Sequence, residues 1–193
     1  IIFKFENLKI KREDLLHPII SGNKFRKLKY NIQEAKRLGH STLLTFGGAF
    51  SNHILAVAGA GAEFGFNTIG VIRGEELENN IDANPTLSQA KDFGMQFHFI
   101  SRDLYREKET QSFILQLQEK FGDFYLLPEG GTNFLAIKGC EEILTVEDKT
   151  FFTHVVCSTG TGGTFSGLVN SSTENQKLIG FSSLKGAFLS DVI

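Results

Sequence analysis

Short apolar runs alternate with longer segments of helical spacing along most of the chain. The unbroken apolar runs predict strands, because the strands of a parallel sheet are buried on both faces. These runs lie at residues 43–46, 68–72, 96–100, 124–127, 154–157 and 178–181. Helices are expected between them, at residues 52–64, 84–93, 107–121 and 134–144. The alternation predicts an α/β protein with mainly parallel sheets.

Local signals support individual elements. In the helix expected at residues 107–121, Phe113, Leu117 and Phe121 fall on one side, which is the pattern of an amphipathic helix. Asn84 followed by Pro85 is typical of a helix cap and a first-turn proline. Residues 75–83 are polar and are expected to form a surface loop.

Composition narrows the class of protein. The chain has 193 residues, of which 41% are hydrophobic and 22% charged, so it can bury a core. A net charge of −2 argues against binding to nucleic acid or to a membrane surface. No apolar run reaches membrane-spanning length and no signal-peptide pattern opens the chain. We therefore expect a cytoplasmic protein, and we expect part of the natural chain to be missing at both ends.

The two cysteines, Cys140 and Cys157, have no neighbours at metal-ligand spacing. They are interpreted as small buried hydrophobic residues in a reducing compartment. No metal site is predicted.

A Gly-Gly turn lies in the stretch TFGGAFSNH, residues 45–53, where an expected strand meets an expected helix. Ser51 or Asn52 would cap that helix. Free backbone N–H groups and the helix dipole could hold a carboxylate or a phosphate there, although an ordinary capped connection explains the pattern as well. His53 is interpreted as a packed or solvated histidine.

A second glycine-rich turn lies in CSTGTGGTFSG, residues 157–167. Its glycines let the backbone wrap closely round an anion, and Thr161 and Thr164 can add hydroxyl donors. No lysine follows the glycines, so the stretch is not a nucleotide P-loop. Phe165 stands where a dinucleotide fingerprint needs its third glycine. An anion-binding turn is the favoured interpretation.

Lys24 lies in SGNKFRKLKY, residues 21–30, at the end of a tight turn that enters a helix. Near other cations, such a lysine can have a lowered pKa and act as a nucleophile. Taken alone, a solvated lysine is the simpler interpretation. The exposed face of this helix is expected to carry Arg26, Lys27 and Lys29.

Three stretches in this order resemble the pyridoxal-phosphate enzymes of fold type II: KREDLLHPIISGNKFRKL, GGAFSNH and STGTGGT. The resemblance is closest to the 1-aminocyclopropane-1-carboxylate deaminase and D-cysteine desulfhydrase family. PEGGTNFLAIKGCEEI (residues 128–143) and IGFSSLKG (residues 179–186) are also similar, so nearly the whole chain is covered.

The resemblance implies a two-domain, tryptophan synthase β-like fold of parallel twisted sheets with flanking helices. Residues 1–40 and 127–193 would form a larger cofactor-binding domain that is incomplete at its C-terminus. Residues 41–126 would form a smaller domain, with pyridoxal 5'-phosphate in the cleft between the two.

The resemblance also assigns roles to residues of this sequence. Lys24 would form the Schiff base with the cofactor and, once freed, act as general base. Asn52 would lie beside the phenolic oxygen of the cofactor, and Ser51 would face the substrate carboxylate or move a proton. The cofactor phosphate would be held by the second turn, at Gly160, Thr161, Gly162, Gly163 and Thr164.

The implied function is a deaminase or lyase that acts on a small amino acid and releases ammonia and a 2-oxo acid. The Ser-Asn-His sequence is associated more with the desulfhydrase side, but both the D-amino acid and the cyclopropane substrate stay open. A homodimer is a further expectation from the family.

Two departures keep alternatives open. Phe50 stands where family members often carry Gln, and the family's C-terminal tyrosines have no counterpart in Tyr30, Tyr105 or Tyr125. These departures motivate a catalytically impaired cofactor-binding homologue as an alternative. An amino-acid racemase also stays open, because it could use the same lysine with Ser51 as the acid on the opposite face. A nucleotide-binding domain is disfavoured by the missing fingerprints, and no stretch resembles the lysine motif of cysteine synthases or threonine dehydratases.

Overall fold

The computed structural model describes residues 7–183, which include all the expected strands. The last residues of the 179–186 stretch, and the chain end beyond them, lie outside the described residues. The strands are β1 (Thr42–Gly47), β2 (Asn67–Arg73), β3 (Gln96–Ile100), β4 (Tyr125–Leu127), β5 (His154–Thr159) and β6 (Lys177–Ser182). The α-helices are α1 (Asn23–Leu38), α2 (Asn52–Phe64), α3 (Pro85–Asp92), α4 (Arg102–Tyr105), α5 (Gln111–Phe121), α6 (Phe134–Cys140), α7 (Val146–Phe151) and α8 (Gly163–Ser171). Short 3-10 helices are η1 (Glu13–Leu15), η2 (Glu75–Ala83) and η3 (Glu129–Gly131).

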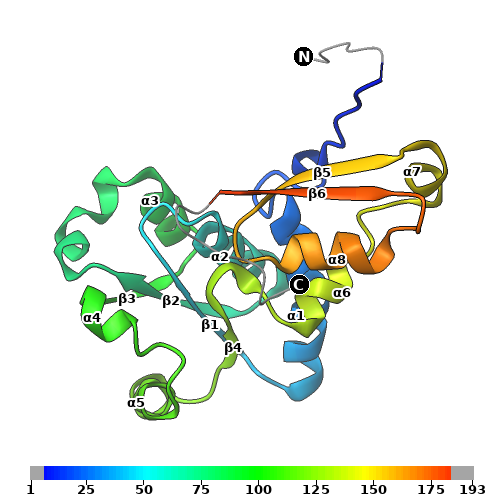
Figure 1. Ribbon diagram of the computed structural model, residues 1–193. Coiled ribbons are helices and arrows are strands. Elements are labelled where there is room, and N and C mark those ends of the chain that lie inside the picture. Colours follow the sequence, from blue (N-terminus) through cyan, green and yellow to red (C-terminus); the bar gives the residue numbers. More distant parts are fainter. Residues whose placement is uncertain (1–6, 184–193) are drawn as a thin grey trace.

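The strands form two parallel sheets (Figure 1). One has four strands in the order β3-β2-β1-β4, and the other pairs β5 with β6. Within the first sheet, Leu44 of β1 is level with Ile69 of β2 and with Leu126 of β4. The expected α/β architecture with parallel sheets is confirmed.

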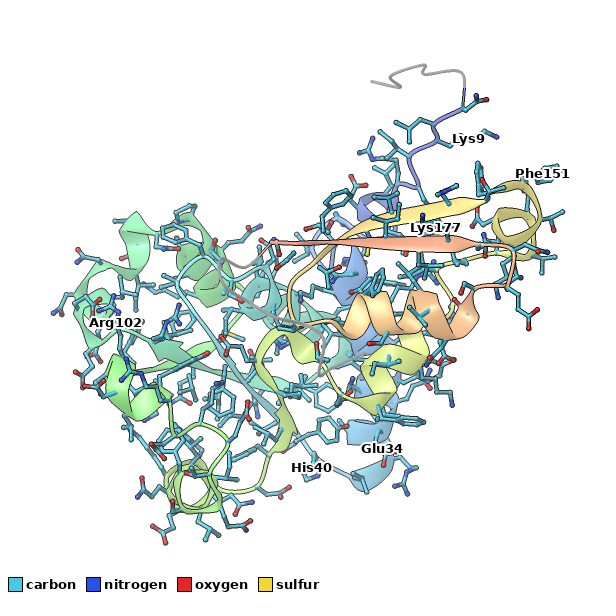
Figure 2. The ribbon with its side chains drawn as sticks, in the orientation of Figure 1. Lys9, Glu34, His40, Arg102, Phe151 and Lys177 are labelled. Carbon is cyan, nitrogen blue, oxygen red and sulfur yellow. The ribbon has the colours of Figure 1, made fainter. Side chains whose placement is uncertain are left out.

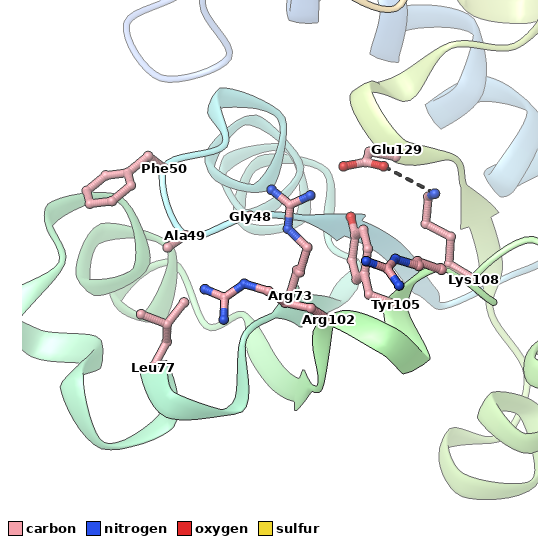
Figure 3. Close-up of a pocket in the computed structure, with 10 residues that line it drawn as sticks. Gly48, Ala49, Phe50, Arg73, Leu77, Arg102, Tyr105, Lys108 and Glu129 are labelled. Atoms are coloured by element: carbon pink, nitrogen blue, oxygen red, sulfur yellow. Dashed lines mark ion pairs between the residues drawn. The ribbon is translucent and has the colours of Figure 1, made fainter. Parts of the chain in front are cut away.

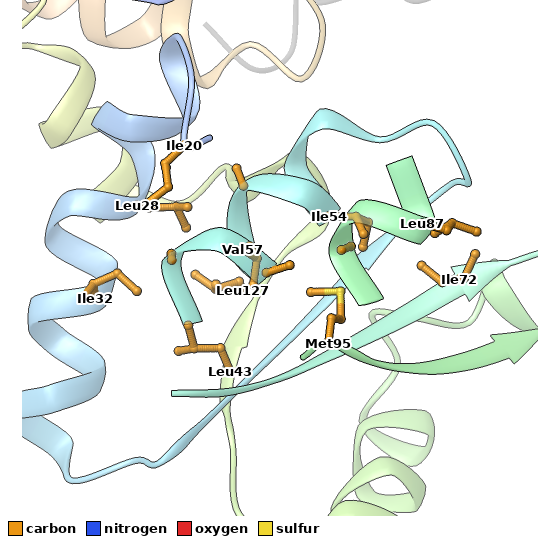
Figure 4. Packing of buried hydrophobic residues seen from close by; sticks show 14 of the residues in the cluster. Ile20, Leu28, Ile32, Leu43, Ile54, Val57, Ile72, Leu87, Met95 and Leu127 are labelled. Carbon is orange, nitrogen blue, oxygen red and sulfur yellow. The ribbon is translucent and has the colours of Figure 1, made fainter. Parts of the chain in front are cut away.

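Each face of the four-stranded sheet is covered by a different set of helices. Successive strand residues point to opposite faces, so neighbouring residues of one strand pack in different layers. On one face, Leu43, Ile72 and Leu127 pack against buried residues of α1, α2 and α3 (Figure 4). On the other, Leu44 packs in a cluster with Phe113 of α5. The amphipathic face predicted for α5 is thus the face that closes this second layer.

Three packed helices, α1, α6 and α8, connect the two-stranded sheet to the four-stranded sheet. Gly139 of α6 and Gly167 of α8 let these helices approach closely: a Cβ on Gly139 would lie 2.0 Å from the Arg26 carbonyl oxygen of α1. A Cβ on Gly167 would lie 2.4 Å from the Cβ of Cys140. Helix α6 consequently packs against both α1 and α8 (Figure 1). The start of α1 also lies near the start of α8, where Asn23 contacts Thr164.

Cys140 is buried in the cluster beneath this second sheet, as expected, whereas Cys157 is only half-buried. Figure 2 places Phe151 and Lys177 on the side of the two-stranded sheet and Arg102 on that of the four-stranded one.

Most bounds lie within two residues of the expected ones, and three segments differ more clearly. Helix α5 begins at Gln111 rather than at residue 107, because the Thr110 hydroxyl caps it by accepting from the Phe113 N–H. Residues 75–83 form η2 rather than a loop, since Leu77 and Ile81 pack against the core. The helix expected at residues 134–144 ends at Cys140.

Strands β1 to β4 use residues 42–127, and β5 and β6 use residues 154–182. The division into domains of residues 1–40 with 127–193 and residues 41–126 stays a prediction. Among residues 7–183, no helix combines the length and the apolar character that crossing a bilayer requires.

Candidate active site

Lys24 stands in the first turn of α1, directly after a turn that only glycine adopts easily. Gly22 has φ 60°, which lets the chain reverse just before Asn23 begins the helix. The Lys24 ammonium donates to the Gly130 carbonyl oxygen at 2.9 Å. Burial, together with the charge of Lys27, lowers the pKa of Lys24 to about 7. Much of this amine is therefore unprotonated near neutral pH.

Lys27 is buried, so its expected place on an exposed helix face is wrong. Its side chain is 2% exposed and donates from Nζ to the Gly130 carbonyl at 3.0 Å and to Thr132 Oγ1 at 2.8 Å. Thr161 Oγ1 lies 3.4 Å from the same nitrogen. The reason is helical spacing, because a residue three positions after Lys24 shares its face. Burial lowers the pKa of Lys27 as well.

The second turn, residues 160–164, meets this helix face. Strand β5 ends just before it, and Gly162, with φ 82°, leads into α8 without any side-chain cap. Asn23 Nδ2 donates to Thr164 Oγ1 at 2.8 Å. A Cβ on Gly163 would lie 2.7 Å from the Cγ2 of Thr132, so this position has no room for a side chain. The predicted phosphate turn and the lysine helix are thereby brought together.

The first turn, residues 47–51, is arranged differently. Ser51 caps α2, and its Oγ accepts from the Ile54 N–H at 3.4 Å. Asn52 and Lys24 both line a cleft of about 350 Å³, which we call the lysine cleft. Ser51 is next to this cleft in the chain but is not among its lining residues. Phe50 is 74% exposed.

His53, in the first turn of α2, is 1% exposed, which decides between the packed and solvated interpretations. Its Nε2 is 2.8 Å from Thr45 Oγ1, and its Nδ1 has no hydrogen-bond partner within the described part of the chain. Burial, reinforced by the charges of Lys24 and Lys27, holds the pKa of His53 well below its usual value. The ring is therefore neutral, and it packs against Gly131, where a Cβ would lie 2.8 Å from its Cε1.

These residues fit an anionic cofactor. Lys27 is a buried cation and Lys24 a half-buried one, and among residues 7–183 neither has a carboxylate within ion-pair distance. The uncapped start of α8 presents backbone N–H groups beside Thr161. A phosphate group would supply the missing negative charge and accept from those donors.

Comparison with known proteins also points to a phosphate-containing cofactor. Residues 4–185 match the family model described as "Pyridoxal-phosphate dependent enzyme". A protein of Thermotoga maritima named "Putative 1-aminocyclopropane-1-carboxylate deaminase" is 35% identical over 170 residues, covering 84% of this chain and 53% of the relative. The mitochondrial "Bifunctional D-cysteine desulfhydrase/1-aminocyclopropane-1-carboxylate deaminase" of Arabidopsis thaliana is 31% identical over 82% of this chain and 43% of its own length.

A solved structure described as an "ACC deaminase homologue" superposes with a TM-score of 0.73 at 25% identity. The match covers 94% of this chain and 57% of that one. The chain thus spans about half the length of the curated relatives it matches.

Proposed function

The chain belongs to the pyridoxal-phosphate dependent enzyme family, and we propose that it acts as a deaminase or lyase on a small amino acid, releasing ammonia and a 2-oxo acid. The names of its relatives support this reaction class. The observation that carries the proposal is the half-buried Lys24 amine, with a pKa of about 7, in a cleft that it shares with Asn52.

Pyridoxal 5'-phosphate, when bound, supplies an aldehyde that reacts with amines and a ring that withdraws electrons from a substrate carbon. We propose that Lys24 anchors it and that Asn52 lies beside its phenolic oxygen. The second turn would hold the phosphate, with Gly160, Thr161, Gly162, Gly163 and Thr164 as its residues. Lys27, which sequence reasoning missed, joins this set because its ammonium lies against Thr161.

Lys24 is also the proposed general base. An amine whose pKa lies near the working pH takes up and returns protons readily, because both forms are populated. The Gly130 carbonyl, which accepts from Nζ at 2.9 Å, fixes the direction of the amine. Lys24 would take the α-proton of a D-amino acid, or a proton from the CH₂ of the cyclopropane substrate.

Ser51 is proposed to bind the substrate carboxylate or to relay a proton. Its Oγ accepts from the Ile54 N–H, which leaves the hydroxyl proton free to be donated. We further propose a cytoplasmic homodimer, as the family resemblance suggests.

An ammonia-release assay on the cofactor-loaded, full-length protein tests this function. D-cysteine and 1-aminocyclopropane-1-carboxylate are the two substrates to compare, with Lys24→Ala as the variant and Lys29→Ala as the matched control on the same helix. We expect ammonia and a 2-oxo acid from one or both substrates. The Lys24 variant should lose at least about a thousandfold in rate, as expected on removing a nucleophile and base, and the Lys29 variant should keep wild-type rates.

Two other outcomes would contradict the proposal. Interconversion of L- and D-amino acids without ammonia would identify a racemase. Bound cofactor with no turnover of any amino acid would identify a non-catalytic homologue.

A further inference from the structure

A second cavity, of about 570 Å³, lies at the carboxyl ends of β1, β2 and β3 (Figure 3). We call it the arginine cavity. Gly48 lines it from the first turn, Arg73 from the end of β2 and Tyr105 from the end of α4. Glu129 lines its other side, and the next residue is Gly130, whose carbonyl accepts from Lys24. The cavity therefore borders the proposed active site without including Lys24.

The charges around this cavity do not balance. Its lining contains four cations and one carboxylate. Three of the cations already have acidic partners, in the pairs Arg102–Glu76 at 2.5 Å, Arg106–Asp103 at 3.0 Å and Lys108–Glu129 at 3.4 Å. The fourth cation, Arg73, has no ion-pair partner anywhere in the described residues. One positive charge in the cavity is thus left without a partner.

Arg73 is held in place by an aromatic ring and by the first turn. Its guanidinium lies over the Tyr105 ring, 5.6 Å from the centroid. One guanidinium nitrogen is 3.6 Å from the position that a Cβ on Gly48 would occupy. The planar fork of donors is therefore directed into the cavity beside the turn that leads to Ser51 (Figure 3).

Tyr105 adds a donor that also lacks a partner. The residue is 3% exposed, and its hydroxyl makes no hydrogen bond of good geometry among residues 7–183, although the Glu129 carboxylate lies close enough to act on it. Burial, with a smaller effect of the Glu129 carboxylate, raises the pKa of Tyr105, so its hydroxyl stays protonated. A buried hydroxyl without a partner is costly and uncommon. Its presence beside an unpaired guanidinium points to a ligand that accepts from both.

We propose that the arginine cavity is a binding subsite for a carboxylate group, held by the Arg73 guanidinium and the Tyr105 hydroxyl. A carboxylate neutralises the unpaired cation and accepts two or more hydrogen bonds at once. The group belongs to an acidic amino-acid substrate or to a separate small acid. Only that choice of source rests on the proposed function, because carboxylate binding itself needs no turnover.

Isothermal titration calorimetry of the full-length protein with succinate measures the affinity of the subsite. Succinamide, the uncharged diamide of the same length, is the control ligand. Arg73→Gln is expected to weaken succinate binding at least tenfold. Arg102→Gln removes a cation of the same cavity that is already paired with Glu76, and it should change binding less than twofold. Equal losses in the two variants, or succinamide binding as tightly as succinate, would overturn the proposal.

Tyr105→Phe separates a ligand-binding role from a structural one. It deletes only the unpartnered hydroxyl, so we expect several-fold weaker succinate binding with an unchanged or higher unfolding temperature. A variant that loses stability but binds succinate normally would show that the hydroxyl serves the fold.

The source of the carboxylate follows from kinetics on the substrate that the ammonia assay identifies. Competition between succinate and that amino acid would assign the subsite to the substrate. Simultaneous binding would assign it to a separate acid. If the protein releases no ammonia from any amino acid, the proposed function fails while the succinate titration still decides whether the subsite exists.

Discussion

The two glycine-rich turns, residues 47–51 and 160–164, occupy equivalent places, each between a parallel strand and the helix that follows it. Their helix starts differ. The Ser51 side chain caps α2, whereas α8 begins at Gly162 without a side-chain cap and faces the buried Lys27. A side chain of the first turn thus accepts from a backbone N–H at the start of α2. The start of α8 has no such acceptor, and it lies beside a cation that has no carboxylate partner among residues 7–183. Two turns with similar sequence patterns and similar positions can therefore be suited to binding different groups.

Removing the Lys27 cation is expected to have the largest effect on the difference between the two turns. Lys27→Met should weaken pyridoxal phosphate binding by about 3 kcal/mol, the order expected when one partner of a buried charge pair is removed. That corresponds to roughly a hundredfold in Kd, measured by absorbance titration.

The matched control for this variant is Lys29→Met, on the exposed side of the same helix, where Lys29 pairs with Glu142. It should leave cofactor affinity unchanged. Equal affinity in the two variants would mean that Lys27 does not face the phosphate.

Adding a methyl group tests the space at each turn. In Gly163→Ala the new Cβ would lie 2.7 Å from Thr132, which accepts from Lys27, so Thr132 and the ammonium must shift. Overpacking of this kind costs about 1–3 kcal/mol of unfolding free energy, measurable by urea denaturation. Gly48→Ala in the first turn would meet its nearest atom at 3.6 Å and should fold normally. The opposite ranking of the two variants would contradict the described packing.

Stability should depend on pH through the lysines between the turns. Because the pKa of Lys24 is about 7 in the folded state against 10.5 in the reference state, the unfolded chain binds more protons above pH 7. The unfolding free energy of the cofactor-free protein should therefore rise from pH 7 to 8.5, by at most about 1.4 kcal/mol per pH unit for one proton. Urea denaturation at several pH values measures this slope. Lys24→Met should flatten it, and a variant with the wild-type slope would show that Lys24 is not buried as a neutral amine.

The smallest effect is expected at the cap of the first turn. Ser51→Ala removes the acceptor for the Ile54 N–H and should cost about 1 kcal/mol of unfolding free energy. Cofactor affinity measured in the same variant should stay within about threefold, since the phosphate is assigned to the other turn. A loss as large as that of Lys27→Met would reverse the assignment.

Much of the fold could be predicted because each buried parallel strand forms a continuous apolar run in the sequence. The runs at residues 96–100 and 52–64 became β3 and α2 with the expected bounds. Boundaries failed where a cap decided them, as at Thr110, or where two apolar residues in a polar segment found the core, as with Leu77 and Ile81. Such contacts depend on the tertiary arrangement and are not visible in a local pattern.

The candidate site was only partly predictable. The motifs placed Lys24 near the second turn, and the contact between Asn23 and Thr164 agrees with that order. Lys27 was misread, because a cation on a charged helix looks exposed until another element packs over it. The unpartnered hydroxyl of Tyr105 had no sequence signal at all, since its surroundings come from β2, α4 and the segment before Gly130.

The assignment of the active site depends on which of two lysines, Lys24 and Lys27, anchors the cofactor. Borohydride reduction of the full-length protein with pyridoxal phosphate, followed by tandem mass spectrometry of its peptides, decides this directly. We predict a visible absorption band before reduction and a single pyridoxyl group on Lys24, with Lys27 unmodified. A group on Lys27, or one scattered over exposed lysines, would contradict the assignment of the second turn as the phosphate site.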